Sequence, residues 1–516
     1  MTGRTDRRAL LLGALLAVAA LAILISIFSA GYFPVQADET DVAWVAKQVA
    51  MGRAPYGDFF SFIPPLTLYG LGAFFKAVGP SLAALRLLTV AWLTGLTLLC
   101  HLLLLRWKVP AGWAFGAALS LPALFLPFWP VPSHHWFAMG FGLLSLAALS
   151  GPRRSPRNWF YAGGLVGLSG LCLQTEGLFF AAMLVLLLLT DEGGPKGRSA
   201  FWASAGLALP LLLFGFLLLL SGTAGWAFYD LVLWPARYYK QTGGFNDVKP
   251  LQFLPALWRD AVPRPFRWTG LAPLALLSLC MALPALALLL PGFSPVWTGG
   301  RREGRGEWLV GAGGILLAFL LYVNGRGDWT HLVMISPLLL LFTARSLDWT
   351  SERWRPGAMK AWIAAALVLA AVRWPAYWIQ RPPILSQVAA VDARLVRESV
   401  PAVLGRLPGV LEKKLPVLYL SSQGSALYLY WAPVPPPVDW LMPPSSRYNA
   451  PWEYAMAARF AQEHRVPYIL ISANQHAAFL TDPSPVRDLL KDHYRPYLDT
   501  PWGKVLERIP DGAPAP

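Results

Sequence analysis

The chain has 516 residues, of which 56% are hydrophobic and only 14% are charged, and its formal net charge at pH 7 is +15. This composition excludes an ordinary soluble domain, and because Lys and Arg lie mostly in short segments between apolar runs, the positive charge indicates membrane topology rather than nucleic-acid binding. The three cysteines lie inside apolar runs, which excludes a disulfide framework and a thiolate metal cluster.

The apolar runs predict a mainly α-helical polytopic membrane protein. A bilayer core of about 30 Å needs roughly 20 residues of helix, and about eleven runs approach that length. The predicted crossings lie near residues 9–30, 84–105, 111–129, 136–150, 159–174, 176–190, 200–221, 270–291, 308–323, 331–346 and 360–379. We interpret the first as an uncleaved helix, because no convincing small-residue cleavage site follows it.

The basic segments predict the orientation. Lys and Arg recur in the segments that fall on the N-terminal side of the membrane if the crossings alternate: 106–108, 151–158, 193–198, 299–308 and 351–360. The positive-inside rule makes that side cytoplasmic. Residues 31–83 and the chain beyond residue 379 are therefore expected on the external or periplasmic side of a cytoplasmic (plasma) membrane.

Two short runs meet at "LCLQTEGLFF", where Gln174 and Glu176 interrupt the apolar sequence. Because both flanking loops are basic, we predict a helical hairpin with its tip on the external side. A carboxylate in such a hairpin is costly unless it is paired. Glu176 is therefore either a substrate-binding residue or one half of a buried ion pair, with Arg or Lys as the expected partner.

The composition changes after the last crossing. Strand-length apolar runs appear at residues 415–421 and 466–472, and amphipathic helical segments at 451–464 and 485–494. This pattern predicts a small external α/β domain over residues 380–516, following a transmembrane domain over residues 1–379.

A motif pattern follows the first crossing. The chain contains no Walker A, dinucleotide-binding, HExxH or nucleophile-elbow motif. Instead, residues 31–90 contain, in order, Asp38 with Glu39, Tyr56 with Asp58 and Phe59, Pro64 with Pro65, Lys76 with Gly79, and Leu85 with Arg86. This pattern resembles the first external loop of the GT-C class of membrane glycosyltransferases. It is most similar to the branch related to the protein O-mannosyltransferases and the aminoarabinose transferase, including the RgtA/B/C/D-like group.

The resemblance implies a function. The expected reaction is transfer of a sugar from a polyprenyl-phosphate donor to a lipid, polysaccharide or protein acceptor on the external face. Asp38 matches the residue that acts as general base in the class. Glu39 is expected to orient Asp38 or to hold a divalent cation; no other cofactor is implied.

Cations are needed to stabilise the departing phosphate. The best candidates lie in "NGRGDWTH", where Arg326 and His331 flank Asp328; the turn is equally compatible with a structural role. Arg237, Lys240 and Lys76 are the alternatives. Tyr56 is expected to bind substrate, Asp58 is expected to bind the acceptor or to cap the turn before Phe59, and Gln174 is grouped with Glu176 as substrate-binding.

Other readings stay open. Asp38 and Glu39 are also compatible with a solvated helix start that the helix dipole favours, and His134 with His135 is assigned a loop or interface role. A polymerase or ligase for surface polysaccharide is the main functional alternative. A secondary transporter is less favoured, because paired interrupted helices in two related halves are not evident. An oligosaccharyltransferase is disfavoured by the lack of a "WWD" sequence.

Overall fold

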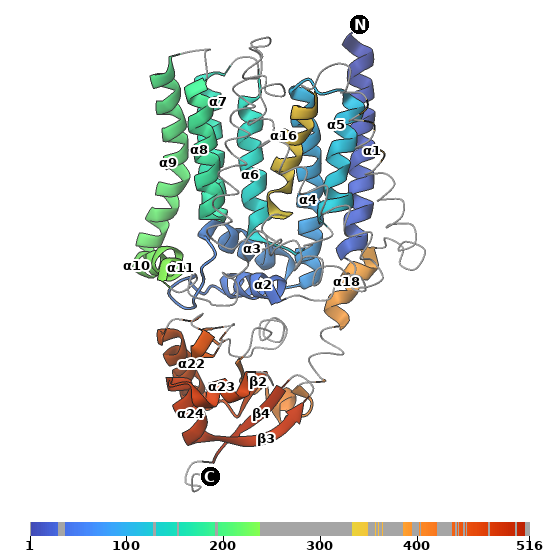
Figure 1. Ribbon diagram of the computed structural model, residues 1–516. Coiled ribbons are helices and arrows are strands. Elements are labelled where there is room, and N and C mark those ends of the chain that lie inside the picture. Colours follow the sequence, from blue (N-terminus) through green and yellow to red (C-terminus); the bar gives the residue numbers. More distant parts are fainter. Residues whose placement is uncertain are drawn as a thin grey trace.

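The computed structural model describes residues 2–28, 37–126, 131–151, 154–190, 195–237, 333–348 and 385–394, and, with gaps, 402–420 and 436–510. Apolar helices form a bundle (Figure 1). These helices are α1 (Thr2–Phe28), α4 (Leu82–Arg106), α5 (Ala111–Ser120) with the π-helical turn η1 (Leu121–Phe125), α6 (His134–Leu149), α7 (Pro156–Cys172), α8 (Gln174–Thr190), α9 (Lys196–Leu220) and α16 (Ser336–Asp348).

Three helices of the described part are long and apolar enough to cross a membrane: Arg7–Phe28, Leu82–Arg106 and Lys196–Leu220. Shorter apolar helices cover Ala111–Phe125, His134–Leu149, Gln174–Thr190 and Ser336–Arg345. The predicted helical membrane architecture is thus confirmed. The crossings predicted at 270–291 and 308–323, and nearly all of 360–379, lie outside the described residues, so the number eleven stays a prediction.

The break predicted near Gln174 is present. Helix α7 ends at Cys172, Leu173 takes an extended conformation (φ −158°, ψ 117°), and α8 begins at Gln174. The two helices approach closely, because a Cβ atom on Gly177 would lie 2.2 Å from the Gly170 Cα. The segment is therefore a tight helical hairpin.

Two helices after α1 do not cross the bundle but lie across one end of it (Figure 1): α2 (Ala37–Ala50) and α3 (Pro65–Val78). Gly52 (φ 87°) follows α2, and α3 runs from a proline at its first position to Gly79 (φ 88°). Both glycines have a positive φ, which glycine adopts more readily than other residues. We call these two helices the surface platform; the predicted first external loop is thus largely helical.

The same end of the bundle carries further short elements and the C-terminal part of the chain (Figure 1). After α9 follow α10 (Ala224–Phe228), the π-helical turn η3 (Tyr229–Leu233) and α11 (Trp234–Arg237). Helix α18 (Leu385–Arg394) leads toward the C-terminal domain. Its Asp392 accepts hydrogen bonds from the Leu82 and Ala83 amides and from the Ser81 hydroxyl, which fixes α18 to the start of α4.

The C-terminal domain contains a four-stranded sheet with strand order β1-β2-β4-β3. Strands β1 (Val417–Leu420) and β2 (Tyr468–Ser472) are parallel, while β4 (Gly503–Arg508) is antiparallel to β2 and to β3 (Tyr494–Thr500). The helices of this domain are α20 (Val410–Lys413), α22 (Pro451–Glu463), α23 (His476–Thr481) and α24 (Pro485–His493). Both predicted strands and both predicted helices are confirmed, whereas the β3–β4 hairpin was not predicted and the boundary at residue 379 stays a prediction.

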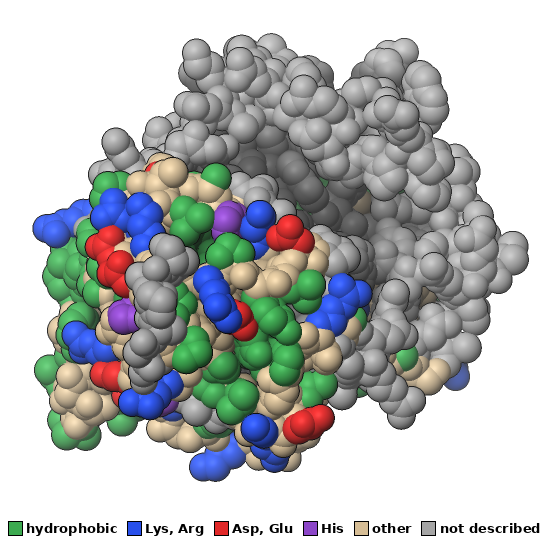
Figure 2. Space-filling model, turned by 90° about the horizontal axis from the view of Figure 1, so that it is seen from below, with side chains coloured by type: hydrophobic (Ala, Val, Ile, Leu, Met, Phe, Trp, Pro, Cys, Tyr) green, Lys and Arg blue, Asp and Glu red, His purple; other side chains and the backbone are tan. Residues whose placement is uncertain are grey.

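The sheet belongs to the same continuous hydrophobic core as the surface platform. Buried side chains of α2 and α3, including Val42 and Phe75, share that core with Tyr419, Leu470 and Val505 of the sheet. Seen from the end opposite the N-terminus, the described surface of the domain mixes Lys and Arg with Asp, Glu and apolar side chains (Figure 2). The domain is therefore packed on the platform through its apolar side.

Candidate active site on the surface platform

Asp38 and Glu39 occupy the first turn of α2, where the helix dipole favours negative charge. Successive residues of an α-helix are separated by about 100°, so that neighbours face different ways. Accordingly, Glu39 is fully buried and Asp38 is exposed. The acid pair thus consists of one inward carboxylate and one carboxylate at the surface.

Glu39 forms a bidentate ion pair with Arg86 of α4. Arg86 Nε lies 2.6 Å from Glu39 Oε1 and Nη2 lies 2.7 Å from Oε2, while Nη1 donates to the Phe28 carbonyl at 3.1 Å. Both side chains are fully buried. The three hydrogen bonds join the end of α1, the start of α2 and the start of α4, and so they fix the position of Asp38.

The turn between α2 and α3 is held by its own side chains. Tyr56 adopts a positive φ of 69°, and its hydroxyl donates to the Ile63 carbonyl at 2.8 Å. Asp58 Oδ2 accepts from the Ala54 amide at 2.8 Å, and Arg53 donates to the Asp58 carbonyl at 2.9 Å. Tyr56 and Asp58 therefore shape this turn; substrate binding by either residue stays a prediction.

Glu176 is buried at the start of α8 beside the start of α6. Its Oε1 lies 3.2 Å from His135 Nδ1, and the exposed fraction of the two side chains is 3% and 14%. A buried ion pair was one of the two alternatives for Glu176, and His135 is the partner among the described residues; a pair with Arg or Lys stays a prediction. Neighbouring Gln174 is exposed and donates to the Leu231 carbonyl at 3.3 Å.

Two of the remaining predicted residues lie in the described part of the chain. Lys76 is exposed on α3 and Arg237 is exposed at the end of α11, whereas Lys240, Arg326, Asp328 and His331 lie outside the described residues. Across the described part of the chain, no group of three or more His, Cys, Asp and Glu residues is arranged to hold a metal ion. Glu39, which was a candidate cation ligand, has both oxygens bonded to Arg86.

Asp230 is a buried acid that the sequence analysis missed. It lies in η3 with no exposed surface, and its Oδ2 accepts from the Ser61 amide at 3.1 Å. Burial raises the pKa of Asp230 to about 8; the Ser61 N–H opposes this shift and the negative charge of Glu453 adds to it. An acid inside the apolar run "GWAFYDLVLW" was the available signal.

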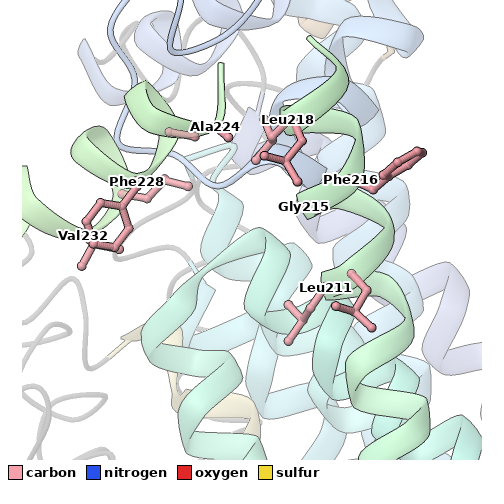
Figure 3. A pocket seen from close by; sticks show the side chains of 11 residues that line it. Leu211, Gly215, Phe216, Leu218, Ala224, Phe228 and Val232 are labelled. Carbon is pink, nitrogen blue, oxygen red and sulfur yellow. The ribbon is translucent and has the colours of Figure 1, made fainter. Parts of the chain in front are cut away.

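An apolar groove of about 750 Å³ lies between α9 and the short elements that follow it (Figure 3). Figure 3 places Leu211, Gly215 and Phe216 along α9, with Phe228 and Val232 across from them. The groove is lined by Leu211, Leu212, Gly215, Phe216, Leu218, Leu219, Ala224, Ala227, Phe228, Leu231 and Val232. A lining without charged side chains suits a hydrocarbon chain.

The chain has the fold of the GT-C class, as the resemblance of residues 31–90 implied. Among similar solved structures is ArnT from Cupriavidus metallidurans bound to undecaprenyl phosphate, with a TM-score of 0.58 and 14% identity, covering 97% of this chain and 98% of that one. Another is the oligosaccharyltransferase AglB from Archaeoglobus fulgidus in complex with an inhibitory peptide and a dolichol-phosphate. It has a TM-score of 0.51 and 15% identity, covering 99% of this chain and 75% of that one. No protein-family model and no curated protein matches the sequence.

Proposed function

We propose that this protein is a membrane glycosyltransferase that transfers a sugar from a polyprenyl-phosphate donor to an acceptor hydroxyl on the external face of the membrane. The observation that carries the proposal is the surface platform, which presents Asp38 at the end of the bundle from a helix fixed by the Glu39–Arg86 pair. The likeness in fold to ArnT and AglB, whose structures contain undecaprenyl phosphate and dolichol-phosphate, supports the same class of donor.

Asp38 is assigned as the general base. Its carboxylate is exposed, so an acceptor hydroxyl can approach it, and the start of α2 favours the charged form that accepts a proton. As the acceptor oxygen attacks the sugar carbon, its proton passes to Asp38 and the bond to the phosphate oxygen breaks. Glu39 is assigned a positioning role, because both of its oxygens are engaged by Arg86.

The donor is expected to place its chain and its phosphate in different parts of the protein. The groove along α9 is assigned to the hydrocarbon chain, because it is apolar and its α9 wall is exposed where lipid would surround the bundle. The phosphate is assigned to cationic side chains, with Arg237 and Lys76 as candidates at the same end of the bundle. Lys240, Arg326 and His331 stay candidates from the sequence. A guanidinium grips phosphate oxygens with two hydrogen bonds, which favours arginine.

A polymerase or ligase for surface polysaccharide is the second candidate. It shares the lipid-linked donor and the external site, and it differs only in an acceptor that is itself a glycan chain. The packing of the C-terminal sheet on the platform suits either activity, since the domain lies beside the proposed site in both. The two candidates are distinguished by the acceptor that a purified enzyme uses.

The deciding experiment compares Asp38→Asn with the wild type in a transfer assay with a defined polyprenyl-phosphate sugar. Asparagine keeps the size of the side chain but accepts no proton, so turnover should fall by about 10²-fold or more. Asp488→Asn is the control, because Asp488 is an exposed acid of α24 in the C-terminal domain, outside the surface platform. Normal turnover by a well-folded Asp38→Asn protein would remove Asp38 from the chemistry.

A further inference from the structure

The segment that joins α2 to α3 is held by aromatic contacts with two distant parts of the chain. The Phe60 ring centroid lies 5.0 Å from that of Trp234 in α11 and 5.7 Å from that of Trp452 in α22. Phe62 stacks on Trp234 at 5.3 Å with an interplanar angle of 15°. We call these four side chains the aromatic junction. It connects the surface platform to the C-terminal domain.

Asp230 lies at this junction and is bound to the backbone of the joining segment. Its Oδ2 accepts the Ser61 N–H, and Ser61 lies between the two phenylalanines of the junction. Among the described residues, Asp230 Oδ1 has no hydrogen-bond partner and no Lys, Arg or His forms an ion pair with Asp230. A buried carboxylate with a single hydrogen bond is costly, whereas the neutral acid is not.

The ionisable neighbours of Asp230 within the described ranges do not relieve this cost. Glu453 of α22 is fully buried, accepts from Asn449 at 2.8 Å and adds negative charge near Asp230. Tyr56, on the turn that precedes Ser61, donates a hydrogen bond to the Ile63 carbonyl. Burial raises the pKa of Tyr56 well above the usual value, and the Asp230 charge adds to this shift. The nearest basic residue along the chain, Arg237 at the end of α11, is exposed.

We propose that Asp230 is a positioning residue that holds the Phe59–Ile63 segment against the C-terminal domain while its carboxyl is neutral, and that ionisation of this carboxyl opens the aromatic junction. The consequence for catalysis rests on the proposed function, because Asp38 lies on the helix that leads into this segment. An opened junction releases the segment that follows α2, so the platform loses its aromatic contact with Trp452 of α22.

The pH range of this effect follows from the shifted pKa of the Asp230 carboxyl. A hydrated aspartate has a pKa of about 3.9, and in the closed junction burial raises the pKa of Asp230 to about 8. The closed state therefore binds more protons than the open state between these values. By linkage, the stability that the neutral carboxyl contributes is fully present below the lower value and is lost progressively as the pH rises through the higher one.

Hydrogen exchange of the peptide that contains Ser61 tests this proposal in the full-length protein. Asp230→Asn keeps the shape and the acceptor for the Ser61 N–H but does not ionise. Because the peptide is identical in both proteins, its chemical exchange rate cancels at each pH. The ratio of the wild-type rate to the variant rate should rise by about tenfold or more from pH 6 to pH 8.5. A constant ratio would overturn the proposal.

Glu453→Gln is the matched control at the same junction. It removes the neighbouring negative charge, so the pH dependence should persist with its midpoint moved to lower pH. A pH dependence that vanishes in Glu453→Gln and persists in Asp230→Asn would make Glu453 the titrating group and overturn the assignment. If Asp230→Asn does not fold, the wild-type rate corrected for chemical exchange still decides, because a pH-independent value contradicts the proposal. If the exchange ratio rises with pH as expected but the protein transfers no sugar, only the proposed function is rejected.

Discussion

Both carboxylate oxygens of Glu39 accept hydrogen bonds from the Arg86 guanidinium, at 2.6 and 2.7 Å, although the two fully buried residues belong to different helices. A buried pair of this kind repays its desolvation only when geometry is good and the remaining donors are satisfied. Here the remaining donor contact goes to the Phe28 carbonyl at the end of α1. The pair therefore acts as the attachment point of the surface platform.

Removing one partner of this pair should be strongly destabilising. Arg86→Met leaves Glu39 as an uncompensated buried charge, which costs about 3–5 kcal/mol, and Arg86→Lys loses the two parallel hydrogen bonds. The control is Arg106→Met at the opposite end of the same helix, where the exposed side chain donates to Ala147 and Ser150, so a smaller loss of about 1 kcal/mol is expected. Thermal unfolding of the detergent-solubilised proteins measures the difference. Equal melting temperatures for Arg86→Met and Arg106→Met would mean that the pair does not fix the platform.

The two ends of the bundle should lie on opposite sides of the membrane, with the platform and the C-terminal domain outside. In a background without the native thiols, cysteines at Ala77 on α3 and at Ser445 in the C-terminal domain should react with an impermeant maleimide on intact cells. Gly151, near the end of α6, should react only after lysis. All three positions are exposed. Labelling of the Gly151 variant on intact cells, without labelling of the other two, would show that the topology is the reverse of the predicted one.

The elements that the sequence predicted well are those with a strong repeating signal. Apolar runs of membrane length, the polar break before Gln174, and the runs that became β1 and β2 all carry such a signal. Helix α3 was not predicted, and a helix start at Asp38 was only one of the open interpretations, because both helices are short and carry no apolar run of membrane length. Strands β3 and β4 were missed because β3, "YRPYLDT", is mostly exposed and contains a proline, so it lacks an apolar run.

The candidate site was harder to predict for a physical reason. Asp38 and Glu39 were found from the local pattern, but Arg86 lies 47 positions beyond Glu39 and its pairing depends on how α4 packs against α2. His135 likewise meets Glu176 only because the starts of α6 and α8 are adjacent. The burial of Asp230 depends on the packing of η3 against the segment around Ser61 and against α22. Such contacts follow from tertiary packing, which local sequence patterns do not specify.

Close packing between α7 and α9 gives a sharp stability test. A Cβ atom on Gly163 would lie 2.0 Å from the Ala203 carbonyl oxygen, a backbone atom that cannot move aside cheaply. Gly163→Ala should therefore destabilise by about 1–3 kcal/mol. On the adjacent residue, a Cβ of Gly164 would lie 3.6 Å from the Gly206 oxygen, so Gly164→Ala should be neutral or slightly stabilising, since alanine favours helix. Thermal unfolding of both variants in one detergent measures the difference in stability. Indistinguishable melting temperatures would contradict this packing.

Filling the groove along α9 should weaken donor use without disturbing the fold. Gly215 lines the groove, and a Cβ atom there would meet no other atom within 4 Å, so Gly215→Phe places a ring in open space (Figure 3). If the donor's hydrocarbon chain occupies the groove, displacing even one or two buried methylene groups costs about 0.8 kcal/mol each, which raises the donor KM by roughly 4- to 15-fold. The acceptor KM and kcat should change little.

The control for this variant lies on the same helix. Gly197 is exposed at the opposite end of α9, and a Cβ atom there also meets no atom within 4 Å, so Gly197→Phe adds the same ring far from the groove. Steady-state kinetics with donors of different chain length shows whether the defect comes from a blocked groove or from a general effect of the added ring. The Gly215→Phe defect should shrink for a donor whose chain is too short to reach the ring. A defect equal for short and long donors, or equal in both variants, would remove the groove from donor binding.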